Sequence, residues 1–195
     1  MSEQKKRLTL LVVIMVLIAT SLSIIGSKLL YETSLIEQRH RLHELVQSQA
    51  SLAKVFFQHY EQMNKDLNIK FDADKVVKMI ASAQYEFNIK SKSGKFTVAQ
   101  KTNDFIKFLI INGKVVSPEN PLRKVSFDSK KAIPMKKALK LESGTIINLD
   151  CRGKEVLTAY TPMKVGDLTL GMVAKIDMNK LRRPFIMAPR RSVWN

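Results

Sequence analysis

Three titratable side chains, Glu37, His40 and His43, follow one another at three-residue spacing. In a helix this spacing brings ligands onto one face, as in the carboxylate-bridged metal centres of helical bundles. Those centres need further carboxylates from partner helices, and here the group stands alone. We therefore interpret it as a solvated helix face, and we predict neither a metal nor a cofactor.

The only cysteine, Cys151, stands beside Arg152 and Lys154. Neighbouring cations lower the pKa of a thiol and favour the nucleophilic thiolate. No histidine is near it in the sequence, and the chain has no Gly-rich phosphate loop, no Gly-x-Ser-x-Gly elbow and no His-Glu-x-x-His motif. We expect Cys151 to be a surface turn residue and the chain not to be an enzyme.

Four residues are favoured for contact with a ligand: Lys175, Tyr160, Thr158 and Tyr85. The first three fall on one face of predicted strands, and that face mixes apolar residues with hydroxyls and a lysine. Small-molecule pockets are lined in this way, and a lysine inside one favours a carboxylate ligand. The alternative stays open, because β-propensity alone also places threonine and tyrosine in strands.

Three predicted strands position these residues, at 145–150, 155–162 and 168–176, with turns at Arg152-Gly153 and Gly166-Asp167. They form an antiparallel meander. If both turns are two-residue hairpins, the register sorts the side chains onto two faces. An apolar face, which should meet a helix, holds Leu157, Ala159, Thr161, Leu170, Met172, Ala174 and Ile176. The mixed face holds Thr145, Ile147, Leu149, Val156, Thr158, Tyr160, Gly171, Val173 and Lys175.

The segment before this meander predicts the rest of a mixed domain. A short helix over 75–87 contains Tyr85, and strands follow over 94–101 and 105–111. The nearly all-apolar second strand suits a central position covered on both faces. Asn112-Gly113 predicts a hairpin into Val115-Val116. A proline-containing loop and a short basic helix over 135–141 complete the domain.

The N-terminus carries a membrane signal. The basic residues Lys5, Lys6 and Arg7 precede an uncharged run over 8–26. At about 1.5 Å per residue this run spans about 28 Å, close to the hydrocarbon thickness of a bilayer. A signal peptide cleaved near Ser21-Leu22-Ser23 is the alternative, but the run is longer than a usual signal h-region. The positive-inside rule places residues 1–7 in the cytoplasm and the chain after residue 26 outside, at the inner (cytoplasmic) membrane.

Residues 27–64 contain neither proline nor glycine and predict a long helix that leaves the membrane. An amphipathic stripe runs along it: Leu35, Leu42, Val46, Ala53, Phe56 and Tyr60. A helix continuous with a membrane span can transmit motion, or it can merely pack on the next domain. A homodimer through Leu35, Leu42 and Val46 is expected.

The chain of 195 residues is strongly basic, with Lys+Arg 33 against Asp+Glu 17 and a net charge of +16. Almost all of this excess lies after the predicted membrane segment, where nucleic acid is a poor partner. The basic residues are interleaved with acidic ones and match no nucleic-acid-binding motif. We therefore expect no nucleic acid among the partners, and instead the membrane surface and an anionic small molecule.

Two segments resemble the extracytoplasmic Cache sensor regions of bacterial histidine kinases and cyclases. One is LYETSLIEQRHRLHELVQSQASLAKVF over 30–56, which is similar to their membrane-proximal helix. The other is EVLTAYTPMKVGDLTLGMVAKIDMNKLRRPF over 155–185, which is similar to their last two strands and exit. The resemblance implies an α+β fold in which a PAS-like five-stranded antiparallel sheet, with flanking short helices, occupies residues 65–177. It carries over no ligand-binding residues, because the amino-acid-binding motif of some double-Cache receptors is not visible.

The sequence departs from such receptors after the resemblance ends at residue 185. Residues 178–195 are expected to be a truncated tail that stops before a second membrane helix and an output domain. The expected function is extracytoplasmic sensing of a small solute, passed to the membrane helix in a two-component or related signalling system. The alternative is a membrane-anchored interaction or dimerisation module without a small-molecule ligand.

Overall fold

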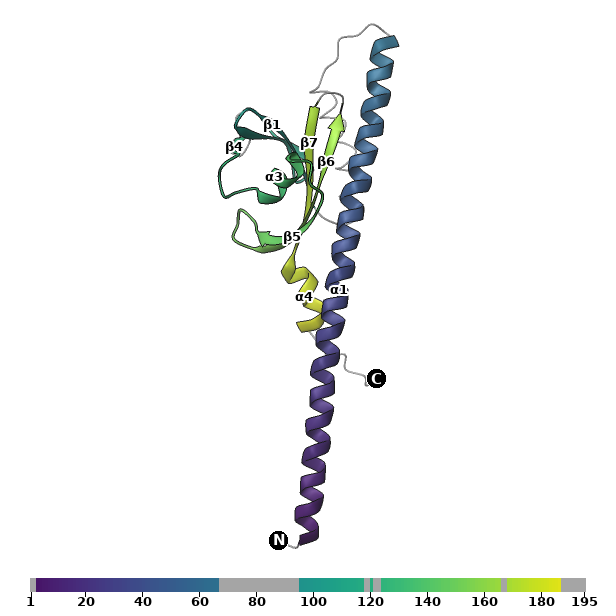
Figure 1. The fold of residues 1–195 in the computed structure, drawn as a ribbon, viewed down its shortest axis with the longest axis vertical. Coiled ribbons are helices and arrows are strands. Elements are labelled where there is room, and N and C mark those ends of the chain that lie inside the picture. The colour runs from purple at the N-terminus through teal and green to yellow at the C-terminus, as the bar shows by residue number, and fades with distance from the viewer. Residues whose placement is uncertain (1–2, 67–94, 118–119, 121–123, 166–167, 187–195) are drawn as a thin grey trace, which may run out of the picture. The chain divides into compact units, whose positions relative to one another are not determined.

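The structure is a computed structural model that describes residues 3–66, 95–117, 120, 124–165 and 168–186. It has the expected α+β composition, with one long helix and one antiparallel sheet (Figure 1). In chain order the elements are α1 (Glu3–Asp66), β1 (Lys95–Thr102), β2 (Phe105–Ile111), β3 (Lys114–Val115), β4 (Lys124–Ser126), α3 (Ile133–Leu139), β5 (Gly144–Leu149), β6 (Glu155–Val165), β7 (Leu168–Asp177) and α4 (Met178–Ile186). The chain divides into two compact units, residues 39–181 and residues 1–38 with 182–195.

The sheet has seven strands where the sequence predicted five. Its order is β3-β2-β1-β7-β6-β5, and β4 also pairs with β2. Five longer strands form the run β2-β1-β7-β6-β5, and the two additional strands are only two and three residues long. The predicted central position of β2 holds only in part, because β1 pairs along one side of it and only the short strands β3 and β4 pair along the other.

The predicted hairpin at Asn112-Gly113 is confirmed. Ile111 pairs with Lys114 across the turn, and both turn residues have positive φ, 54° at Asn112 and 79° at Gly113. Two consecutive positive φ values belong to the type I′ turn, whose twist matches that of the flanking strands.

The predicted meander of β5, β6 and β7 is confirmed, but the register of β5 is not the predicted one. Thr145 pairs with Ala159 and Ile147 with Leu157, so these residues lie on the apolar face and not on the mixed face. The reason is the turn, which has three loop residues because the N–H of Asp150 donates to the carbonyl of Lys154 at 2.9 Å. One extra loop residue moves every side chain of the strand to the other face.

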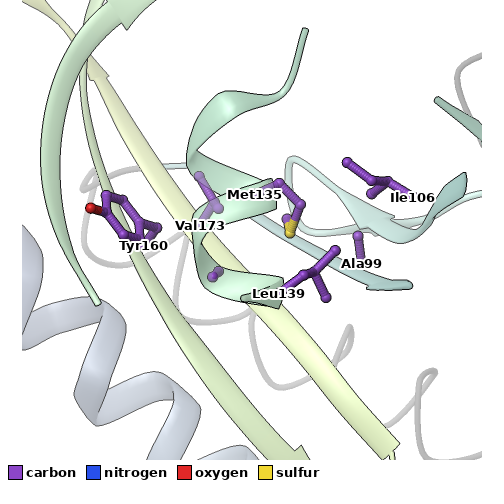
Figure 2. Packing of buried hydrophobic residues seen from close by; sticks show 7 residues of the cluster. Ala99, Ile106, Met135, Leu139, Tyr160 and Val173 are labelled. Atoms are coloured by element: carbon purple, nitrogen blue, oxygen red, sulfur yellow. The ribbon is translucent and has the colours of Figure 1, made fainter. Parts of the chain in front are cut away.

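Helix α3 covers the mixed face of the sheet. A buried cluster joins the helix to β1, β2, β6 and β7, and it consists of Ala99, Ile106, Met135, Ala138, Leu139, Tyr160 and Val173. In Figure 2, Met135 and Leu139 lie between α3 and Ala99, and Tyr160 lies on the other side of the helix. Close approach of α3 requires Gly171, because a Cβ there would lie 2.6 Å from Met135 Sδ and 3.1 Å from Ala138 Cβ.

The predicted long helix is confirmed within α1, and its buried stripe differs from the predicted one. The stripe repeats every three or four residues: Leu42, Val46, Ala50, Ala53 and Phe57. Phe57 is buried, whereas Phe56, which the spacing predicted for the stripe, is 50% exposed. Leu42 and Val46 are buried inside the chain itself. The prediction that these two side chains form a dimer contact is therefore wrong.

The unit of residues 1–38 with 182–195 contains the apolar run of α1. By length and composition α1 is the one described helix suited to cross a membrane, and the large apolar side chains of its N-terminal run are exposed. Part of the expected C-terminal tail is also helical, as α4. The guanidinium Nε of Arg182 on this helix donates to the Tyr31 hydroxyl on α1 at 3.3 Å.

Candidate functional site

Three of the four favoured ligand residues lie on the same face of the sheet, as predicted. Thr158 of β6 pairs directly with Lys175 of β7, and Tyr160 pairs with Val173. Residues two apart in a strand point to one face, so Thr158, Tyr160 and Lys175 share the face that α3 covers. The fourth residue, Tyr85, and its predicted helix over 75–87 lie outside the described residues.

Tyr160 is a core residue of this face. Its side chain belongs to the cluster beneath α3, and only 7% of the residue is exposed (Figure 2). The ammonium of Lys137, on α3, lies 5.9 Å from the centre of the ring. Gly144 comes close on the strand side, because a Cβ there would lie 3.2 Å from the Tyr160 hydroxyl. The ring of Tyr160 therefore links α3, β6 and the start of β5.

Thr158 is buried, and its hydroxyl is already bonded within the chain. The side chain donates to Oδ1 of Asn148 across β5 and β6 at 2.8 Å. The amide group of Asn148 in turn donates to the carbonyl of Leu149 at 3.0 Å. A ligand that contacts the Thr158 hydroxyl must therefore share it with Asn148.

The ammonium of Lys175 lies 3.6 Å from the carboxylate of Asp150, and a quarter of the lysine side chain is exposed. This places Lys175 at the end of β7 beside the β5–β6 turn. A ligand carboxylate that binds here therefore competes with Asp150 for the same cation.

The carboxylate of Asp150 organises this turn. It accepts hydrogen bonds from the backbone N–H of Arg152 at 2.8 Å and of Lys154 at 3.1 Å, and from Nε of Arg152 at 2.8 Å. Arg152 also bonds Asp177 at 3.0 Å, at the end of β7. The charges of Asp150, Arg152, Lys175 and Asp177 are thus matched in one network.

These contacts decide the protonation of Asp150, whose side chain is only 3% exposed. Burial by itself raises the pKa of this carboxyl. The hydrogen bonds from the Arg152 side chain and from the two backbone N–H groups outweigh burial, and the charge of Lys175 adds to them. The pKa of Asp150 is therefore held well below its usual range, and the group is ionised at neutral pH.

Sequence reasoning missed Asn148 and the role of Asp150. One signal was present, because an aspartate two residues before an N–H donor in a Gly-containing turn is typical of an Asx-turn. The prediction of Cys151 as a surface turn residue is confirmed, since Cys151 is exposed in this turn.

His43 of α1 contacts a residue next to the sheet, a role that neither the metal-site nor the solvated-face interpretation included. Nε2 of His43 lies 3.2 Å from the hydroxyl of Ser143, just before β5. The Ser143 hydroxyl also reaches the Thr161 hydroxyl at 3.2 Å and the carbonyl of Tyr160 at 3.3 Å. This half of α1 is thereby joined to the strand that carries Thr158 and Tyr160.

Within the described part of the chain, no three His, Cys, Asp or Glu side chains gather as metal ligands.

No protein-family model matches the sequence, and neither does any curated protein. Among solved structures, the sensory domain of the Campylobacter jejuni chemoreceptor Tlp3 with isoleucine bound is similar, with 12% identity and a TM-score of 0.43 over 82% of this chain and 67% of that one. The periplasmic sensory domain of the C. jejuni chemoreceptor Tlp1 gives 16% identity and a TM-score of 0.36 over 52% and 35%.

A third similar structure is the ligand-binding domain of the Pseudomonas aeruginosa amino-acid chemoreceptor PctC in complex with GABA. It gives 15% identity and a TM-score of 0.36 over 75% of this chain and 64% of that one. This chain thus spans between about a third and two thirds of the length of these sensory domains. At such identities and TM-scores, the similarity assigns neither a ligand nor an activity to this chain.

Proposed function

We propose that this chain is a membrane-anchored sensor that binds a small solute outside the cytoplasm and passes the change to the membrane through α1. The observation that carries the proposal is the continuity of α1, a single helix over Glu3–Asp66. Its first part is an exposed apolar run, and its later part buries Leu42 and Val46 in the unit that contains the sheet. A helix that is continuous through both parts is a suitable mechanical element.

The membrane part of the proposal rests on the apolar run and its flanks. The run over 8–26 carries no charge, whereas Lys5, Lys6 and Arg7 precede it directly. Hydroxyls within the run are bonded to their own helix, as Thr20 is to the carbonyl of Val16 at 2.9 Å, which removes a cost of burial in lipid. The basic flank orients the sensor to the outside.

The binding part rests on the polar groups of the α3-covered face. Lys175 is a cation of this face whose side chain is partly open to solvent, and its partner Asp150 lies in the adjacent turn. A solute with a carboxylate suits Lys175. Thr158 and Asp150 are already bonded within the chain, so a solute changes the conformation of this face only if it binds one of two states more tightly than the other.

The route to α1 runs through Ser143. This residue bonds the backbone of Tyr160, whose ring lies beneath α3, and it bonds His43 on α1. A displacement of α3 or of Tyr160 on ligand binding therefore reaches α1 through a short chain of direct contacts. All of these residues belong to the unit of 39–181.

One observation favours the second candidate function, an interaction module. In the later part of α1, four large apolar side chains remain exposed outside the buried stripe: Leu52, Val55, Phe56 and Met63. They recur at helical spacing, which is typical of a surface that meets another helix. A homodimer through this face replaces the predicted contact through Leu42 and Val46.

The deciding experiment is thermal unfolding of the full chain in lipid nanodiscs against small carboxylates, amino acids and other solutes. A ligand that binds only the folded state stabilises it by about 2.7 kcal/mol at a hundredfold excess over its dissociation constant. We expect a saturable rise in the midpoint that is lost in Lys175→Met and kept in Lys164→Met, a lysine exposed elsewhere on β6.

If none of these solutes raises the unfolding midpoint of a well-folded chain, the result counts against the sensor. In that case, cysteine crosslinking at Leu52 in a Cys151→Ser background tests the interaction module. Crosslinked dimers that disappear in Phe56→Glu would support it, and a monomer at all concentrations would exclude it.

A further inference from the structure

A polar cluster follows the apolar run of α1 in the unit of residues 1–38 with 182–195. We define this membrane-proximal cluster as Lys28, Tyr31, Arg182 and Arg183. Its centre is the hydrogen bond from Nε of Arg182 to the Tyr31 hydroxyl at 3.3 Å, which joins residues that are 151 positions apart in the sequence. Lys28 lies one helical turn before Tyr31, and Arg183 follows Arg182 on α4.

The position of Tyr31 fixes the depth of the cluster if the run over 8–26 spans the bilayer, as the proposed function holds. Tyr31 comes five residues after Gly26, which is about 7.5 Å along a helix axis. The polar headgroup layer on each side of the hydrocarbon is about 5–8 Å thick. Tyr31 and its partner Arg182 therefore lie at the level of the outer headgroups.

The charge of the cluster suits an anionic headgroup. Three of its four members are basic, and Arg183 and Lys28 are exposed. The acidic residue Glu32 lies 4.0 Å from the Lys28 ammonium, and both side chains are mostly open to solvent, so this pair neutralises the lysine only weakly. Arginine binds phosphate oxygens in a bidentate manner, and tyrosine is typical of the membrane interface.

We propose that the membrane-proximal cluster binds the phosphate of an anionic phospholipid headgroup in the outer leaflet. Arg182 and Arg183 supply the guanidinium donors from α4, while Lys28 adds a cation from α1. A lipid held by residues of both helices adds contacts that keep α4 beside Tyr31. This inference rests on the membrane span of the proposed function and goes beyond its solute site.

The test must separate this site from general attraction, because the whole chain carries a net charge of +16. Arg182→Gln/Arg183→Gln removes two adjacent charges of the cluster. Lys130→Ala/Lys131→Ala removes two adjacent exposed charges elsewhere and is the matched control. Circular dichroism of each full-length variant checks that the helix content is unchanged.

The experiment measures amide hydrogen exchange of residues 178–183 in the full chain, in nanodiscs of phosphatidylcholine with or without phosphatidylglycerol. We expect phosphatidylglycerol to slow the exchange about fivefold, since a basic residue near an anionic surface contributes about 1 kcal/mol. The slowing should be lost in Arg182→Gln/Arg183→Gln and kept in Lys130→Ala/Lys131→Ala.

Three results would overturn the proposal: no dependence on phosphatidylglycerol, equal loss in both double variants, or the same slowing by inorganic phosphate in phosphatidylcholine alone. Alkaline extraction of the chain from membranes tests the membrane span separately, and so distinguishes a failure of the lipid site from a failure of the proposed function. A chain that alkali releases has no span, which overturns both proposals. A retained chain without dependence on phosphatidylglycerol overturns only this one.

Discussion

The hydroxyl of Ser143 lies 3.2 Å from Nε2 of His43, a residue 100 positions earlier in the chain. The same hydroxyl contacts the carbonyl of Tyr160 and the hydroxyl of Thr161 on β6. Ser143 thus joins α1 directly to the strand that carries two of the favoured ligand residues.

Loss of this contact should uncouple α1 from the sheet. Ser143→Ala and His43→Ala each remove one partner, and a typical hydrogen bond contributes about 0.5–1.5 kcal/mol net to stability. We expect each change to lower the free energy of unfolding of the full chain in micelles by about 1 kcal/mol, as measured by thermal unfolding.

A double-mutant cycle isolates the pair. If the two side chains act through one contact, the double variant loses less than the sum of the single variants. His40→Ala, one turn earlier on an exposed part of α1, is the control and should have little effect. Strict additivity of His43→Ala and Ser143→Ala would contradict the proposed link.

The sequence predicted most elements, because their signals are local. The Asn112-Gly113 turn, the alternation along β6 and β7 and the helical spacing of α1 each depend on neighbouring residues. The same reasoning placed Thr158, Tyr160 and Lys175 on one face, as the pairing of β6 with β7 confirms.

The errors arose where specific side-chain contacts, either within a turn or between distant segments, determine the position of a residue. The register of β5 depends on the carboxylate of Asp150, which closes a three-residue loop that sequence spacing cannot distinguish from a two-residue one. Whether Phe56 or Phe57 is buried depends on which of these two adjacent positions faces the rest of the unit of residues 39–181. The contact of Arg182 with Tyr31 joins distant segments and left no local signal.

Asp150→Asn should destabilise the chain at neutral pH. The side chain loses its charge while it keeps its size, and the bonds from Arg152 and the ion pair with Lys175 weaken. Hydrogen bonds to charged groups contribute about 1.5–3 kcal/mol, and the peripheral position of the turn exposes them to solvent screening. We expect a loss of about 1–2 kcal/mol in thermal unfolding, against no loss in Asp128→Asn, an exposed aspartate.

The pH dependence of stability follows from the lowered pKa of Asp150. The unfolded chain has an aspartate pKa of about 3.9, so the stabilisation by the charged form is complete above that pH and is lost as the pH falls through the lower folded pKa. Acid unfolding of the wild type should therefore be steeper below about pH 4 than that of Asp150→Asn. Identical acid profiles would show that this carboxylate has its ordinary pKa.

Thr158→Val tests whether the hydroxyl is structural. The substitution preserves the shape but removes the donor to Asn148 Oδ1 at a position that is 2% exposed. The acceptor that loses its donor, Asn148 Oδ1, belongs to a half-buried residue, so we expect the loss of a typical hydrogen bond, about 0.5–1.5 kcal/mol, and a lower midpoint of unfolding. Thr145→Val, on the other face of β5, serves as the control. An unchanged midpoint in Thr158→Val would mean that the hydroxyl is available for ligand contact.

Gly171→Ala should displace α3 from the sheet. The new Cβ would lie 2.6 Å from Met135 Sδ and 3.1 Å from Ala138 Cβ. The methionine end can rotate away, but Ala138 moves only with its helix, so we expect a loss of about 1–3 kcal/mol, as for overpacking in a core. Met135→Ala relieves the first clash and not the second, but it also truncates a buried core side chain and is destabilising by itself. The cost of Gly171→Ala should therefore be smaller, though not zero, when it is measured in the Met135→Ala background. Gly26→Ala, with open space around it, is the control. If Gly171→Ala costs nothing in the Met135→Ala background, the backbone of α3 does not limit the approach, and no loss in Gly171→Ala alone would show that α3 does not pack on β7 as described.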